Sequence, residues 1–112
     1  ERLLERDYGD FEGLTTAEIR SLNPVWNVWA DPVPNGEGIG DMTARVDALI
    51  VDMRASEAKR TLVVAHAHLI RLFTARWLGL ETVYARLFRI GTLGIVHLGW
   101  ERENPVMHKW NG

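Results

Sequence analysis

Apolar residues recur at spacings of three and four in the middle of the chain, with charged residues between them. The pattern consists of Met42, Val46, Leu49, Ile50 and Met53. This spacing places the apolar side chains on one face of an α-helix. We therefore predict that the longest helix of the chain runs from about Asp41 to Ala58.

A different pattern follows this helix. Residues Thr61–Ala65 form a short apolar run that is rich in β-branched side chains, typical of a strand buried on both faces. From Leu69 to Leu78 the apolar spacing is helical again, and Gly79 is a suitable helix stop. A helix, a buried strand and a second helix in succession predict an α/β sheet.

Towards the N-terminus, residues 1–14 carry close charges without a sustained period, and we expect an ordered loop. Thr15 stands three residues before Glu18, the arrangement of a capping box, so we predict a short helix from Thr16 to Leu22. Pro24 then favours a second short turn, which carries Trp26 and Trp29. Residues 31–38 are rich in Pro, Gly, Asn and Asp and predict a loop.

The last third of the chain predicts smaller elements. We expect a short helical turn over Thr82–Arg86, followed by strands over Ile95–Trp100 and Val106–Trp110. Glu101–Pro105 is then the loop of a hairpin.

Composition bounds the classes of function. A chain of 112 residues accommodates one domain, and 46% hydrophobic with 25% charged residues is ordinary for a folded protein in water. A net charge of −2 argues against a nucleic-acid partner. No apolar run approaches the ~20 residues of a membrane span, so we expect no membrane partner. The chain has no cysteine, which excludes disulfides and a thiol nucleophile, and we expect a cytoplasmic location.

His66 is the first candidate for chemistry, because it ends the predicted strand and precedes a helix. Ligands of open α/β sheets bind beyond the carboxyl ends of strands, and a helix start offers free amides to an anion. His66, the amide of Ala67 and the first helical turn thus form a candidate phosphate site. One alternative is that His66 only caps or packs at the strand end.

Metal binding is a second alternative for the histidines. His68 lies two residues after His66, and His97 and His108 are further imidazoles. Carboxylate ligands at suitable spacing are not evident, so we predict neither a metal nor a cofactor.

Four motifs in order resemble the histidine phosphatase, or phosphoglycerate-mutase-like, superfamily. They are the opening stretch Leu4-Glu5-Arg6-Asp7-Tyr8-Gly9-Asp10-Phe11-Glu12-Gly13, Gly36-Glu37 before a helix with Asp41 and Arg45, the stretch VAHAHLIR around His66, and Gly91-Thr92 leading to Leu98-Gly99-Trp100-Glu101. The resemblance spans nearly the whole chain. It implies part of a three-layer α/β/α sandwich with a mostly parallel central sheet, from which the N-terminal strand is missing.

The resemblance also implies roles for particular residues. Glu5 matches the acid that gives a proton to the leaving oxygen, and His66 matches the pocket histidine that stabilises the phosphoryl oxygens. Ala67 is expected to donate its backbone amide, and Arg6 and Tyr8 match substrate contacts. We expect Glu12 to be structural.

Other prominent side chains are more typical of structural roles. Arg45 and Arg71 have guanidinium groups suited to tying helices together. Trp26 and Trp29 have indoles suited to packing with a polar edge left free.

The chain departs from the family pattern in one decisive way: it contains no Arg-His-Gly, the segment that holds the phosphorylated histidine. A pocket arginine that precedes the Glu5 segment in the family is also missing. In addition, Ala67 replaces the usual glycine and Gly38 stands where serine is common. We therefore expect residues 1–112 to be one truncated domain, inactive alone, whose nucleophile lies outside the chain. Loss of the first strand is also expected to expose an apolar edge and to cause self-association.

Three functions remain open at this stage. A phosphomonoesterase acting on a small phosphorylated substrate is favoured, because mutases of the family carry a long insertion before the second histidine and this chain does not. A phosphoglycerate-type mutase and a non-catalytic phosphate-binding module are the alternatives.

Overall fold

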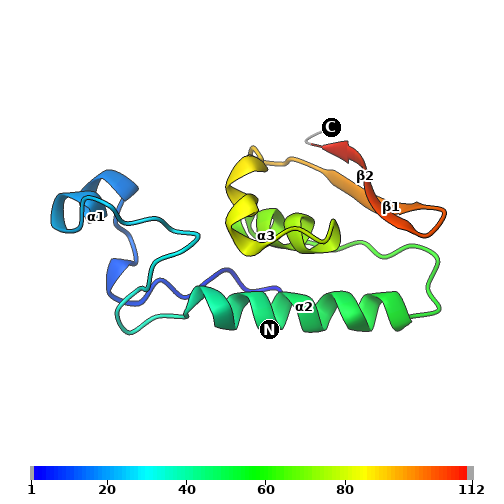
Figure 1. Ribbon diagram of the computed structural model, residues 1–112, viewed down its shortest axis with the longest axis horizontal. Coiled ribbons are helices and arrows are strands. Elements are labelled where there is room, and N and C mark those ends of the chain that lie inside the picture. The colour runs from blue at the N-terminus through cyan, green and yellow to red at the C-terminus, as the bar shows by residue number, and fades with distance from the viewer. Residues whose placement is uncertain (1, 111–112) are drawn as a thin grey trace.

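A computed structural model describes residues 2–110 of the protein (Figure 1). Within these residues, five helical elements precede a β-hairpin in the order η1 Gly9–Phe11, α1 Thr16–Leu22, α2 Ile39–Ala55, α3 Ala67–Trp77, η2 Thr82–Leu87, β1 Val96–Glu101 and β2 Asn104–Trp110. The η elements are short 3₁₀-helices. Residues 8–33, called the α1 region below, lie at one end of α2. The hairpin lies towards the other end, above α3 (Figure 1).

The main hydrophobic core forms where α3 packs on α2. Further residues come from η2 and from residues 23–38, the loop that carries Trp26 and Trp29 and is called the tryptophan loop below. Its buried members are Trp29, Met42, Val46, Ile50, Leu69, Leu72, Ala75, Trp77 and Ala85. Full burial of a valine, leucine, isoleucine or methionine side chain contributes about 1.5–3 kcal/mol to the stability of the fold. The apolar period therefore predicted the correct face of α2, although the helix begins and ends two to three residues earlier than expected.

Helix α3 begins at Ala67, two residues before the expected start, and ends as Gly79 predicts. Gly79 has φ +79°, its amide donates to Arg76 O at 3.1 Å, and the amide of Leu80 donates to Ala75 O at 2.9 Å. These bonds make a Schellman motif, for which glycine is the favoured residue. The stop directs the chain into η2, which packs back on α3.

A second, smaller core supports the α1 region. Ile19, Trp26 and Val33 are buried there, with Tyr8, Phe11 and Val28 packed against them. Helix α1 has the predicted bounds and the predicted capping box, in which Thr15 and Glu18 exchange side-chain-to-backbone bonds. The residues around Trp26 and Trp29 form turns, as expected. Val28 packs against both cores and so joins the α1 region to α3.

Strands β1 and β2 pair antiparallel and confirm the predicted hairpin. The turn is tighter than expected, because Glu101 pairs with Asn104 and only Arg102 and Glu103 lie between them. Arg102 adopts φ +55° there. The register shifts after His97, where a bulge leaves His108 beside the imidazole of His97.

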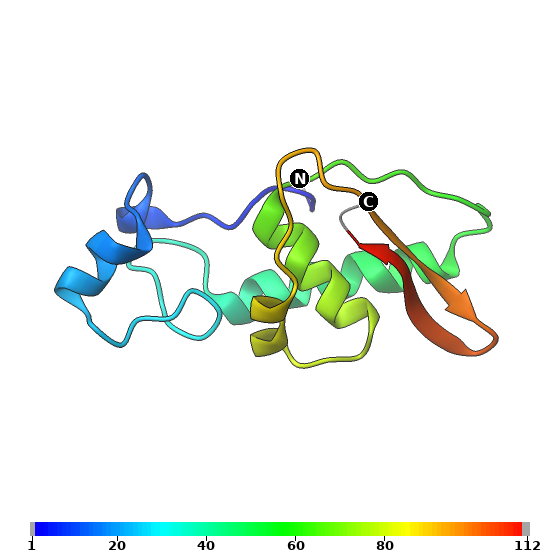
Figure 2. The same ribbon diagram turned by 90° about the horizontal axis from the view of Figure 1, so that it is seen from above.

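The prediction of a buried strand over Thr61–Ala65 is wrong for this chain. The segment runs without regular structure from the end of α2 back to α3 (Figure 2). Leu62 is 90% exposed and Val64 79% exposed. A strand needs a hydrogen-bonded neighbour, and residues 2–110 supply no such neighbour to this segment.

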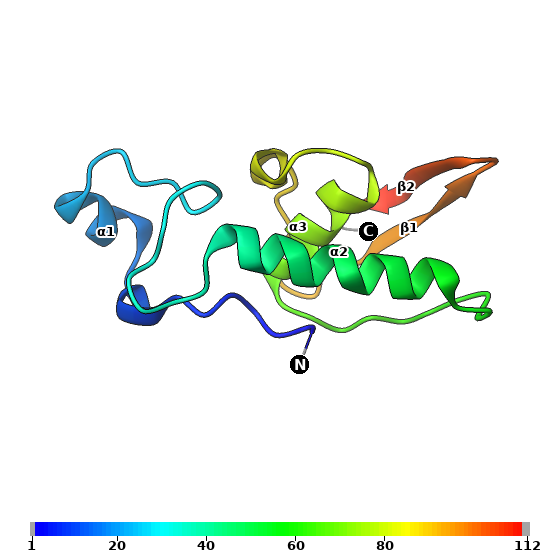
Figure 3. The same ribbon diagram turned by 60° about the horizontal axis from the view of Figure 1, so that its bottom comes forward.

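The expected architecture is shown only in part. The mixed α/β composition is confirmed, but the described residues form a two-stranded antiparallel sheet, without the mostly parallel sheet of a three-layer sandwich. Instead, the segment over residues 58–65, the loop over residues 90–95 and one side of α3 surround an open cavity of about 1770 Å³. Figure 3 shows the segment running as an irregular coil from the far end of α2 back to the start of α3.

Candidate functional site

Glu5 lies at the N-terminus of α3, although it is more than sixty residues away in sequence. Its Oε2 accepts the amide of His68 at 2.9 Å, and its Oε1 accepts the amide of Leu69 at 3.0 Å. The amide of the next residue, Arg6, also donates to Oε1, at 3.2 Å. The first amides of a helix have no partner within the helix and carry the positive end of its dipole. Glu5 therefore anchors the N-terminal loop to α3 with an anion where the helix favours one.

His66 is the residue immediately before this helix. It is exposed, and its side chain makes no capping hydrogen bond. The amide of Ala67, the first helical residue, has no hydrogen-bond partner among residues 2–110. The structure thus brings Glu5, His66 and the Ala67 amide to one helix end. The arrangement differs from the expected phosphate site in one respect, because the next two amides of the helix, those of His68 and Leu69, already donate to Glu5.

Tyr8 is positioned by two loops that pack closely together. The amide of Asp10 donates to Pro34 O at 2.9 Å, and the amide of Glu37 donates to Asp7 O at 2.8 Å. Between these bonds Gly9 has φ +50°, and a Cβ at this position would lie 2.3 Å from Pro34 O. Only glycine fits such a contact. The closed loops direct the Tyr8 side chain towards α3.

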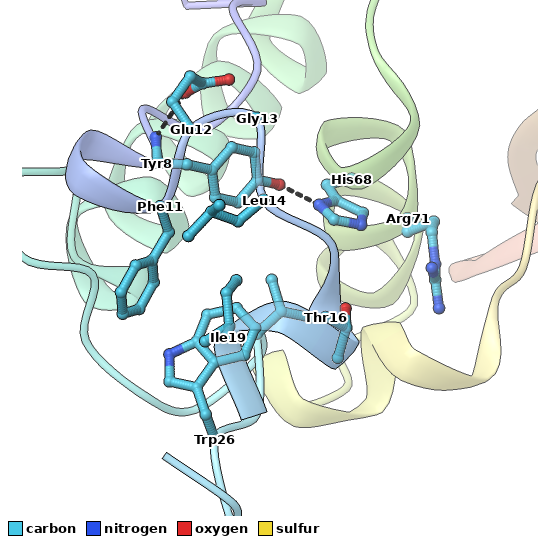
Figure 4. Close-up of a pocket in the computed structure, with 11 residues that line it drawn as sticks. Tyr8, Phe11, Glu12, Gly13, Leu14, Thr16, Ile19, Trp26, His68 and Arg71 are labelled. Carbon is cyan, nitrogen blue, oxygen red and sulfur yellow. Dashed lines mark hydrogen bonds between the residues drawn. The ribbon is translucent and has the colours of Figure 1, made fainter. Parts of the chain in front are cut away.

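The hydroxyl of Tyr8 forms a short hydrogen bond with Nδ1 of His68 (Figure 4). Burial raises the pKa of Tyr8, and the negative charge of Glu5 adds to the rise. Burial lowers the pKa of His68, and the cations Arg71 and Arg6 lower it further against the opposing effect of Glu5. Both effects favour a neutral phenol paired with a neutral imidazole.

A cavity of about 400 Å³ opens beside this pair (Figure 4). It is lined by Tyr8, Phe11, Glu12, Gly13, Leu14, Thr16, Ile19, Trp26, Val28, His68 and Arg71. A volume of ~300–1,000 Å³ is usual for a small-molecule site. Because the amide of His68 binds Glu5 and its ring lines the cavity, the cavity and the helix end are adjacent.

Arg6 does not line this cavity. Its side chain is buried, and its Nε, Nη1 and Nη2 donate to the carbonyls of Glu37, Val28 and Asp31 at 2.8, 2.6 and 3.2 Å. These bonds tie the N-terminal loop to the tryptophan loop. The arrangement favours a structural role for Arg6 over contact with substrate.

Arg45 and Arg71 were both expected to tie elements together. Arg45 forms a two-pronged ion pair with Glu37 at 2.8 and 3.0 Å, and Arg71 donates to the carbonyls of Ala85 and Arg86. Arg71 also lines the cavity, and its guanidinium lies over the ring of Trp29, 5.1 Å from the centroid.

His68 and Arg71 were not predicted to line a cavity. A signal was present, because they are three residues apart on one helix and therefore share a face. The sequence does not show that the loop carrying Tyr8 folds over that face. Within residues 2–110, no three His, Asp or Glu side chains are grouped as ligands for a metal ion.

Comparison with known proteins identifies the class. The model of the histidine phosphatase superfamily, branch 1, matches residues 1–112. The chain belongs to the histidine phosphatase superfamily, as its four motifs predicted.

Two curated relatives carry phosphatase names. An acid phosphatase of Mycobacterium tuberculosis is 35% identical over 100 residues, which are 88% of this chain and 49% of that protein. Sedoheptulose 1,7-bisphosphatase of Saccharomyces cerevisiae is 36% identical over 94 residues, which are 70% of this chain and 35% of that protein. The chain thus spans half or less of the length of these relatives.

Solved structures agree on the fold. The structure of an open reading frame product of Mycobacterium tuberculosis superposes with a TM-score of 0.92 at 32% identity, covering 98% of this chain and 57% of that one. A putative α-ribazole-5′-phosphate phosphatase of Escherichia coli superposes with a TM-score of 0.81 at 23% identity and supports the fold alone. In the described part of this chain, no helix is long and apolar enough to cross a membrane.

Proposed function

We propose that this chain is the C-terminal portion of a phosphomonoesterase that acts through a phosphohistidine. In this proposal Glu5 is the general acid, His66 and the Ala67 amide hold the phosphoryl oxygens, and the nucleophilic histidine comes from a segment outside residues 1–112. The observation that carries it is the meeting of Glu5 and His66 at the N-terminus of α3. That position suits a phosphate, because the helix dipole and the free Ala67 amide both favour an anion.

The proposed reaction has two steps. The nucleophilic histidine attacks phosphorus, the bond from phosphorus to the ester oxygen breaks, and the proton of Glu5 goes to the leaving oxygen. A water molecule then attacks phosphorus and gives a proton to Glu5, the bond from phosphorus to the histidine nitrogen breaks, and inorganic phosphate leaves. His66 and the Ala67 amide stabilise the charge on the equatorial oxygens in both steps.

The hydrogen bonds of Glu5 are compatible with carrying a proton. Oε1 accepts two amides, whereas Oε2 accepts only the amide of His68. A carboxyl oxygen has two in-plane positions, so Oε2 keeps one for the transferred proton. The amides fix the direction of this position, which is the preorganisation that proton transfer requires.

The missing segment also accounts for the unformed strand. We propose that Thr61–Ala65 becomes a strand of a mostly parallel central sheet when an N-terminal strand pairs with it. The exposure of Leu62 and Val64 supports this, because a β-branched apolar run is otherwise unstable in water. The three-layer sandwich is then a property of the longer protein.

The test compares the 112-residue chain with the product of its complete reading frame. We expect the longer protein to hydrolyse p-nitrophenyl phosphate and to form an acid-labile phosphoprotein, and we expect the 112-residue chain to do neither. Glu5→Gln and His66→Asn in the longer protein should lower kcat by at least about 100-fold. Glu103→Gln, at an exposed position in the hairpin turn that lines neither cavity, is the control and should leave kcat unchanged. Equal activity of the two proteins, or full activity of both site variants, contradicts the proposal.

One observation favours a second candidate, a non-catalytic phosphate-binding module. Residues 1–112 contain no Arg-His-Gly, and His66 and Ala67 alone are able to hold an anion. Activity that stays absent in the longer protein, together with phosphate binding that His66→Asn abolishes, supports this candidate. The phosphatase names of both curated relatives favour hydrolysis over the mutase alternative.

A further inference from the structure

We infer that the cavity beside Tyr8 and His68 binds the organic group of the substrate, and that this group is aromatic or otherwise apolar and carries no second phosphate. The inference rests on the proposed function, since it assumes that the phosphate sits at the N-terminus of α3. It adds the class of substrate, a phosphomonoester with an apolar leaving group.

The walls of the cavity are the first argument. Five apolar side chains line it from one side: Phe11, Leu14, Ile19, Trp26 and Val28. The rings of Phe11 and Trp26 meet edge to face with centroids 5.7 Å apart. These five side chains gain free energy by covering an apolar group, and the rest of the lining is polar, with Thr16 and Glu12 among its members.

The charges around the cavity are the second argument. Among residues 2–110, Arg71 is the only arginine or lysine that lines it, and Arg71 already donates from Nε and Nη2 to backbone carbonyls. Glu12 also lines the cavity and carries a negative charge. Arg6 binds three carbonyls and lies outside the lining. A second phosphate in the cavity would lose its hydration. In return it would contact at most Arg71, whose guanidinium already binds two carbonyls, so its binding is disfavoured.

The polar groups at the mouth are the third argument. The Tyr8 hydroxyl and Nδ1 of the His68 imidazole bond each other, so these two atoms are partnered within the protein. The amide of His68 contacts Glu5, so this pair lies between the proposed acid and the apolar walls. An ester oxygen beside Glu5 therefore directs its organic group past Tyr8 and into the cavity.

The experiment measures binding to the 112-residue chain by isothermal titration calorimetry with four probes. 2-Naphthol tests the cavity alone, inorganic phosphate tests the helix end alone, and 2-naphthyl phosphate tests both together. Fructose 1,6-bisphosphate tests a polar ligand with two phosphates. We expect 2-naphthyl phosphate to bind at least about tenfold more tightly than 2-naphthol, inorganic phosphate or fructose 1,6-bisphosphate.

A pair of variants assigns the binding to the cavity. Leu14→Gln changes an apolar wall to a polar side chain of similar size and should weaken both naphthyl probes about fivefold, with inorganic phosphate unchanged. Leu22→Gln is the matched control, because Leu22 is exposed at the end of α1 and does not line the cavity. We expect it to bind all four probes as the parent chain does.

The outcomes separate this inference from the proposed function. If inorganic phosphate binds as tightly as 2-naphthyl phosphate, or fructose 1,6-bisphosphate binds more tightly, the inference is wrong and the phosphate site stands. If 2-naphthol binds as tightly as its phosphate ester, the cavity is confirmed and the phosphate site at α3 is wrong. If neither naphthyl probe binds, or Leu14→Gln changes nothing, the cavity does not take an apolar group.

Discussion

The Tyr8 hydroxyl and the imidazole of His68 are hydrogen-bonded across 60 positions of sequence. The same first turn of α3 presents the His68 amide to Glu5 at 2.9 Å. One residue therefore joins the candidate acid, through its backbone, to the wall of the cavity, through its side chain. A change in the His68 ring is expected to alter the N-terminal loop and the cavity together.

We predict that the protein loses stability below neutral pH because of His68. Its pKa is lowered in the folded state by burial and by Arg71 and Arg6, against Glu5, whereas an unfolded histidine has a pKa of about 6.5. Below that value the unfolded chain binds a proton that the folded chain rejects, so the free energy of unfolding falls as pH falls from about 6.5 towards the folded pKa.

The measurement is urea unfolding at pH 7.5 and pH 5.5 for the parent and for His68→Gln. Glutamine keeps a polar partner for Tyr8 and does not titrate, so the variant should lose less stability between the two pH values. His66, His97 and His108 are common to both proteins and cancel in the difference. Identical losses in parent and variant contradict the assignment to His68.

We predict that Glu5→Gln weakens the attachment of the N-terminal loop to α3. In glutamine an NH₂ group stands in place of one of the two accepting carboxylate oxygens, and this donor then faces a backbone amide donor. Loss of one charge-assisted bond at a helix N-terminus costs about 1–2 kcal/mol. Hydrogen exchange should show faster exchange at the amides of His68 and Leu69. Glu12→Gln, whose carboxylate accepts only the exposed Tyr8 amide, is the control and should leave both amides protected.

The sequence predicted the elements that depend on local pattern and missed what depends on distant partners. The Thr15–Glu18 capping box, the apolar face of α2 and the helix stop at Gly79 each depend on residues that are close in sequence. All three predictions were confirmed. Thr61–Ala65 has an equally strong local pattern, yet it forms no strand, because pairing requires a neighbour elsewhere in the protein.

The candidate site divides in the same way. Glu5 and His66 were singled out by motif, and the structure brings both to the start of α3. The cavity was not predicted, because it exists only where the loop around Tyr8 meets His68. The buried bonds of Arg6 were also missed, since the three carbonyls that it binds come from loops without a local signature.

We predict that Arg6→Met is among the most destabilising substitutions in the N-terminal loop. Arg6 is 3% exposed, and its removal leaves the carbonyls of Val28, Asp31 and Glu37 without their donors. The three bonds are partly buried, and because each lost bond costs about 0.5–1.5 kcal/mol, a total loss of roughly 3 kcal/mol is expected. Urea unfolding measures it. Arg60→Met, at an exposed position, is the control and should change stability by less than about 0.5 kcal/mol.

The final prediction concerns the open apolar face of the 112-residue chain. Leu62, Val64, Leu93 and Ile95 are all more than half exposed and line one cavity of about 1770 Å³. The segment over Thr61–Ala65 also has unpaired backbone groups, which are a template for pairing with another chain. We therefore expect the chain to self-associate, with a sedimentation coefficient that rises with concentration.

Paired lysine substitutions test whether this face is responsible. Leu62→Lys with Val64→Lys places charges on the unpaired segment and should shift the chain to monomer, because like charges oppose edge-to-edge pairing. Leu22→Lys with Val25→Lys removes two equally exposed apolar residues from the α1 region, so it should leave association unchanged. The longer protein, whose N-terminal strand is proposed to cover this face, should not associate through it. A 112-residue chain that sediments as a single monomer at every concentration and unfolds cooperatively is inconsistent with an exposed pairing edge.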